Sequence, residues 1–169
     1  MTLVVPFDGS DLAEAALVRA AEFAAVFDER TLAVSVIPGG NAEYARDRGW
    51  IGPDQSFGLE AVVSTLHEQV TDLYPAADFH HEVVGQYAPP GAISNRLRRV
   101  AKEEDAAMVF IGSENAGRVV SGVSSIGASV ATEVAYDVVI VRNRRPSKIA
   151  KLNDSSPQPP GKSEFYPSE

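Results

Sequence analysis

The sequence contains no cysteine, which excludes disulfide bonds and thiolate chemistry. No apolar run approaches the roughly 20 residues that a bilayer-spanning helix needs. The N-terminus passes directly into the apolar residues 3–5, without the basic region and apolar core of a secretion signal. These absences lead us to expect a soluble, cytoplasmic protein that does not insert into membranes.

Basic side chains are also scarce, and the formal net charge is −8. Residues 1–142 carry 20 acidic and 10 basic side chains, whereas residues 143–169 carry 3 acidic and 5 basic ones. An acidic body repels nucleic acid and anionic lipid. We therefore expect no nucleic-acid partner.

Familiar catalytic patterns are missing as well. There is no Gly-Lys-Ser/Thr of a Walker loop and no serine nucleophile elbow with a histidine partner. His67 lies in an expected helix, and His80 and His81 are adjacent in an expected strand, without metal-ligand spacing. The sequence thus predicts no catalytic residues and no metal site. Slow nucleotide hydrolysis remains an open alternative.

Short apolar runs alternate with segments of helical periodicity along residues 1–142. Strands are expected at residues 3–7, 31–37, 79–84, 106–111 and 138–141, and helices at 12–27, 59–73, 93–101 and 127–135, with a short helix at 42–48. Apolar strands that alternate with amphipathic helices predict an α/β fold with a doubly wound parallel sheet. At 169 residues, one domain is expected.

The last 27 residues differ in composition. Residues 143–169 contain five Pro and five Ser and lack apolar periodicity, so we expect a disordered tail. Its first part is basic, which suits either a solubilising tail or a contact with a partner.

The stretch from 106 to 129 combines an apolar strand, a loop rich in Gly, Ser and Asn, and the start of a helix. Main-chain N–H groups and the helix dipole favour an anion at such a junction. Ligands of doubly wound sheets bind beyond the carboxyl ends of the strands, where Asp8, Val36 and Gly112 are expected. Equally, the glycines suit a tight turn and close helix–strand packing, and Asp8 suits helix capping.

Four segments resemble the universal stress protein family: VVPFDGS at 4–10, AAL at 15–17, EEDAAMVFIGS at 103–113 and VVIVR at 138–142. The resemblance covers residues 1–142. It implies a five-stranded sheet of order 3-2-1-4-5, an adenine nucleotide alpha hydrolase-like fold, and a homodimer paired through the last strand, Val138, Val139, Ile140 and Val141. The exposed edge of an apolar strand favours the same pairing, because a second copy covers it.

The resemblance also implies an ATP site, with Mg²⁺ bound through the phosphates. Nucleotide-binding members carry Gly, two residues, Gly, nine residues, then Gly and Ser or Thr. Gly112 fits the first position, nine residues separate Gly117 from Gly127, and Ser129 follows one position late. Asn115 and Ala128 depart from the pattern. By the same analogy, Asp8 and Val36 contact the adenine and ribose.

Three functions follow as hypotheses. The first is a non-enzymatic, homodimeric regulatory or stress-response protein that binds ATP through Asp8, Val36, Gly112, Gly117, Gly127 and Ser129. The second is a dimeric interaction module that has lost nucleotide binding. The third is a slow ATPase.

Overall fold

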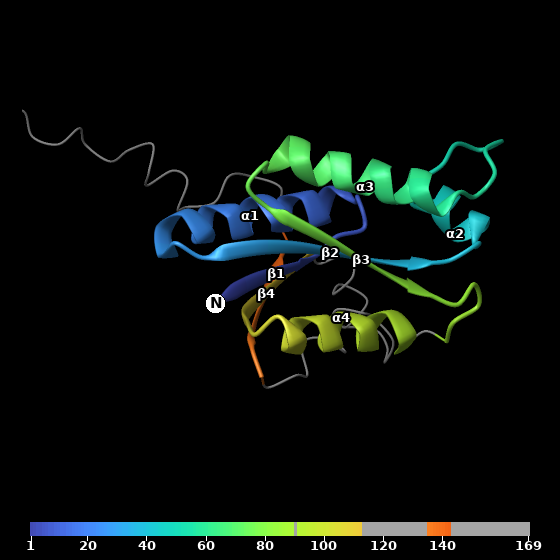
Figure 1. The fold of residues 1–169 in the computed structure, drawn as a ribbon. Helices are drawn as coiled ribbons and strands as arrows, with labels where there is room; N and C mark the ends of the chain where they lie inside the picture. The colour runs from blue at the N-terminus through green and yellow to red at the C-terminus, as the bar shows by residue number, and fades with distance from the viewer. Residues whose placement is uncertain (90, 113–134, 143–169) are drawn as a thin grey trace, which may run out of the picture.

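The computed structural model describes residues 1–89, 91–112 and 135–142 (Figure 1). The elements in chain order are β1 (Thr2–Pro6), α1 (Asp11–Phe27), β2 (Arg30–Pro38), α2 (Ala42–Asp47), α3 (Leu59–Leu73), β3 (Asp78–Val84), α4 (Gly91–Glu103), β4 (Ala106–Gly112) and β5 (Asp137–Val141). Each strand begins and ends within one residue of its expected bounds.

The five strands form one parallel sheet of order β3-β2-β1-β4-β5, which confirms the predicted order. β1 is the central strand and pairs with β2 on one side and β4 on the other. The winding direction therefore reverses at β1, and the carboxyl ends of β1 and its neighbours form the crevice where such sheets bind ligands.

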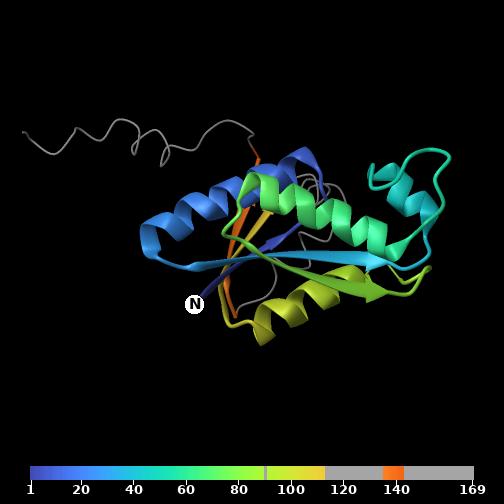
Figure 2. The same ribbon diagram turned by 45° about the horizontal axis from the view of Figure 1, so that its top comes forward.

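Helices cover both faces of the sheet, as a doubly wound fold requires. α1 and α3 lie on one face and α4 lies on the other (Figures 1 and 2). Alternate residues of β2 serve the two faces: Ala33 and Ile37 join the core under α1 and α3, while Val34 and Val36 join the core under α4. Because both faces of β2 are buried, residues 32–37 of this strand are apolar apart from Ser35.

The turn between β1 and α1 sets the direction in which the chain leaves the sheet. Gly9 has a φ of +77°, a left-handed conformation that glycine adopts without strain. Ser10 is the N-cap of α1, and its side chain accepts a hydrogen bond from the N–H of Ala13 at 3.2 Å.

Two sequence predictions fall largely or wholly outside the described residues. Of the helix expected at 127–135, only Ala135 is described, in the bend that precedes β5. The tail at 143–169 lies outside altogether. Within the described part of the chain, no helix is both long and apolar enough to cross a membrane.

Candidate nucleotide pocket at the carboxyl ends of β1 and β2

Hydrogen bonds beyond the regular ladder hold the end of β1 against β2. The N–H of Phe7 donates to the main-chain oxygen of Val34 at 2.8 Å. The buried hydroxyl of Ser35 donates to the main-chain oxygen of Phe7 at 2.6 Å. Asp8 therefore leaves the sheet beside Val36, and the two predicted contact residues come together.

Asp8 and Val36 line one pocket. Its lining combines the ends of β1 and β2 with α4 and with the segment after β2: Pro6, Phe7, Asp8, Val34, Val36, Tyr44, Arg48, Ile93 and Leu97. The lining is mostly apolar, with polar groups from Asp8, Tyr44 and Arg48. An apolar lining with a few polar groups is the usual composition of a small-molecule site.

Asp8 also has a structural task. One carboxylate oxygen accepts a hydrogen bond from the N–H of Ser10 at 3.0 Å, which holds the turn into α1. The capping interpretation of Asp8 is therefore visible in the geometry, although Ser10 supplies the N-cap itself. A ligand contact by Asp8 remains a prediction, and the residue's place on the pocket wall supports it.

Three aromatic and cationic residues of the pocket region were not found from the sequence. The guanidinium carbon of Arg48 lies 3.5 Å from the centre of the Tyr44 ring. Tyr44 in turn contacts Trp50, with ring centres 5.6 Å apart. The sequence did hold signals for this cluster, because Tyr44 and Arg48 are four residues apart along a short helix and Trp50 is the only tryptophan.

The Tyr44 hydroxyl is neutral in ordinary conditions. Burial raises the pKa of Tyr44; the positive charge of Arg48 opposes this effect, and the negative charge of Asp8 adds to it. Tyr44 thus offers a ring and an uncharged hydroxyl to a ligand. It also lies within electrostatic reach of both charged side chains of the pocket lining.

Gly112 ends β4, as predicted, but it faces α1 closely. A methyl group at Gly112 would lie 2.9 Å from both the carbonyl carbon and the Cβ of Leu12. Close helix–strand packing thus requires a glycine here, whatever ligand binds. Gly117, Gly127 and Ser129, like Asn115 and Ala128, lie outside the described residues, so their part in a site remains a prediction.

The histidines have ordinary surroundings. His67 stacks on Phe79, with ring centres 4.9 Å apart and planes 12° apart. His80 contacts Glu82 at 3.1 Å, and His81 is exposed. Within the described residues, no group of three or more His, Asp or Glu side chains has the geometry of a metal site.

A second hollow lies at the opposite end of the sheet. Its polar lining lies near the amino ends of β2 and β3 and consists of Arg30, His67, Asp78, His80 and Glu104. Arg30 pairs there with Asp78 at 2.6 Å and with Glu104 at 2.8 Å. Because the hollow is at the amino ends and its cation is already paired, it is the weaker candidate for an anionic ligand.

The end strand β5 presents an apolar edge. It pairs with β4 on one side, and Ile140 is 38% exposed. Val138 and Val139 are half-buried, and Val141 is buried. An apolar edge strand of this kind is suited to pairing with another strand.

Comparisons with known proteins agree with this fold. The sequence profile of the Universal stress protein family matches residues 1–142. A universal stress protein solved in complex with cAMP is 25% identical, with a TM-score of 0.53, over 83% of this chain and 95% of that one. A hypothetical protein whose biochemical function was assigned from its structure is 17% identical, with a TM-score of 0.56, over 86% of this chain and 97% of that one. No curated protein sequence matches the chain.

The strand order, the two helical layers and the profile match over residues 1–142 point to the same conclusion. The chain belongs to the universal stress protein family.

Proposed function

We propose that this protein is a homodimeric regulatory or stress-response protein that binds an adenine nucleotide, with ATP as the expected ligand. The observation that carries the proposal is the pocket that Asp8 and Val36 share at the carboxyl ends of β1 and β2. Two strands have to end side by side to bring these residues together, and the site lies where doubly wound sheets bind ligands.

A relative adds independent support. The family member that is 25% identical to this chain was solved in complex with cAMP. In this proposal the adenine ring enters the apolar part of the pocket, against Val34, Val36 and Leu97. The phosphates extend toward Gly117, Gly127 and Ser129.

Any Mg²⁺ is bound through the phosphates in this proposal, since the described residues supply no carboxylate cluster to hold it. We propose that the protein is not an enzyme. We also propose that it is located in the cytoplasm. Slow hydrolysis would need a base to activate water, and Asp8 is the acidic side chain among the described residues that line the pocket.

One specific observation favours the alternative, an interaction module without nucleotide. Gly112 and the Asp8 carboxylate both have structural tasks, so neither residue requires a ligand to explain it.

Calorimetric titration with ATP, with and without Mg²⁺, and with cAMP separates the two functions. Saturable heat with one of these nucleotides, and none with the pyrimidine nucleotide CTP, supports nucleotide binding. No heat at millimolar concentrations of ATP and cAMP would leave the interaction module as the better account. Phosphate release that Asp8→Asn abolishes would instead indicate a hydrolase.

A further inference from the structure

A nucleotide that approaches this protein meets an acidic body. Residues 1–142 carry twice as many acidic as basic side chains. Phosphate groups are repelled unless a cation stands at the site. Among the described residues that line the pocket, Arg48 is the one cation and Asp8 the one anion.

Arg48 differs in its partner from three other arginines of the fold. Arg30, Arg96 and Arg99 each pair with a carboxylate at 2.6–3.2 Å. Within the described residues, no carboxylate lies within the 4.0 Å of an ion pair from the Arg48 guanidinium, which rests instead on the Tyr44 ring. Tyr44 is a neutral partner and leaves the positive charge of Arg48 uncompensated, whereas a carboxylate partner would neutralise it.

The backbone that carries Arg48 is held at both ends. Asn41, before α2, donates from its amide to the main-chain oxygen of Gln86, in the loop between β3 and α4. Trp50, two residues after Arg48, donates from its indole to the main-chain oxygen of Asp8. Because these contacts hold the backbone, a rotation of the Arg48 side chain is enough to move its guanidinium from the Tyr44 ring to a bound anion.

From these contacts we propose that Arg48 binds a phosphate of the nucleotide in this pocket, so that the pocket selects nucleotides over nucleosides. This inference rests on the proposed function. The planar guanidinium offers paired donors that match phosphate oxygens, a geometry that lysine lacks. Arg48 therefore offers, from the segment after β2, an anion contact that the sequence analysis did not find.

The test compares AMP with adenosine, which differ only in the phosphate. Calorimetric affinities are measured for the wild type and for Arg48→Gln, Arg48→Lys and Arg46→Gln. Arg46 is the matched control, because it lies in the last turn of α2, two residues before Arg48, and donates to the main-chain oxygen of Gln55, outside the pocket lining. Arg46→Gln changes the net charge by the same amount as Arg48→Gln.

We expect Arg48→Gln to lower the affinity for AMP about ten- to hundredfold, which is the usual effect of losing a charged hydrogen bond. Adenosine affinity should change less than about twofold, Arg48→Lys should retain part of the AMP affinity, and Arg46→Gln should behave as the wild type. If Arg48→Gln binds AMP as tightly as the wild type does, or loses equal affinity for AMP and adenosine, Arg48 does not bind the phosphate. Either result would leave the proposed nucleotide binding standing. A wild type that binds neither AMP, cAMP nor ATP would overturn the proposed function and this inference with it.

Discussion

The indole Nε1 of Trp50 donates a hydrogen bond to the main-chain oxygen of Asp8 at 2.6 Å, across 42 positions of sequence. Trp50 is 6% exposed, and its ring contacts Tyr44. This bond joins the turn after β1 to the segment after β2. The pocket wall thus depends on a contact between two loops.

Trp50→Phe tests how much this contact stabilises the fold. The change removes the donor and leaves the oxygen of Asp8 partly buried without it, so the free energy of unfolding should fall by about 1–3 kcal/mol. Urea denaturation followed by circular dichroism measures the loss. Tyr87→Phe is the control, because Tyr87 is 84% exposed and the change should cost less than about 0.5 kcal/mol. Equal stability of the two variants would mean that the bond contributes nothing.

Gly112→Ala tests the packing role of the glycine that ends β4. The new methyl group would meet Leu12 at 2.9 Å, so the backbone of α1 or β4 has to shift. We expect the unfolding free energy to drop by about 1–3 kcal/mol without any ligand present. Gly85→Ala is the control, since nothing lies within 4 Å of a methyl group there. A Gly112→Ala protein as stable as the wild type would contradict the packing role of this glycine.

The succession of strands and helices along the chain was predictable because it rests on local patterns, whereas the strand order in the sheet followed from the family resemblance. β1, β2 and β4 are buried runs, and α3 shows Val62, Leu66 and Val70 at helical spacing. Two of the nine residues that line the pocket, Asp8 and Val36, were predictable too, because they lie where two strands end. Burial of both strand faces makes such signals strong.

Tyr44, Arg48 and Trp50 were not predictable in the same way. α2 has six residues and buries only Ala45, so it leaves no periodicity to find. The contacts that bring these residues to the pocket join distant segments, as Trp50 and Asp8 show. A pattern along the chain does not report which loops meet. The packing of Gly112 on Leu12 was among the interpretations left open, and the distance shows that it occurs.

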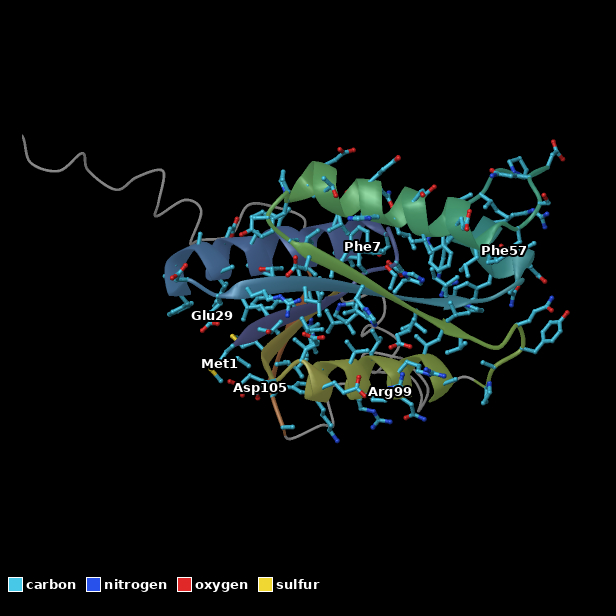
Figure 3. All side chains as sticks on the ribbon, in the orientation of Figure 1. Met1, Phe7, Glu29, Phe57, Arg99 and Asp105 are labelled. Carbon is cyan, nitrogen blue, oxygen red and sulfur yellow. The ribbon has the colours of Figure 1, made fainter. Side chains whose placement is uncertain are left out.

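Glu82 joins the end strand β3 to α4 and should make stability depend on acid. Its carboxylate contacts His80 at 3.1 Å and both Arg96 and Arg99 at 3.2 Å (Figure 3 labels Arg99 on α4). The hydrogen bond with His80, followed by the charge of Arg99, lowers the pKa of Glu82, while burial opposes the shift. A carboxyl whose pKa is lowered on folding stabilises the protein above its unfolded-state pKa, near 4.3.

Glu82→Gln should therefore reduce the unfolding free energy at pH 7 by less than about 1 kcal/mol, because the network is partly solvated. The difference from the wild type should shrink below about pH 4, as the wild-type carboxylate takes up its proton. Urea midpoints at several pH values measure it. Glu68→Gln, an exposed change on α3, should show no such trend. A difference that grows in acid would contradict the assignment.

Ile140→Lys tests pairing through β5. Ile140 is 38% exposed on one end strand, and Val83 is 39% exposed on the other, β3, so Val83→Lys is a closely matched control. If β5 pairs with its copy, the charge at Ile140 should yield monomers by light scattering, whereas Val83→Lys should stay dimeric. If Val83→Lys yields monomers instead, the dimer interface is at β3. If the dimer survives both changes, the last strand is not part of the interface.

In the proposed function, the adenine ring binds at the carboxyl ends of β1 and β2. Photocrosslinking with an AMP analogue that carries an azide on its base, followed by peptide mapping, locates the bound ring. We expect label on peptides that contain Asp8, Val36 or Tyr44, and loss of that label when unmodified AMP is in excess. Label on peptides that contain His67 or His80, at the opposite hollow, would contradict this binding site if excess unmodified AMP removes that label.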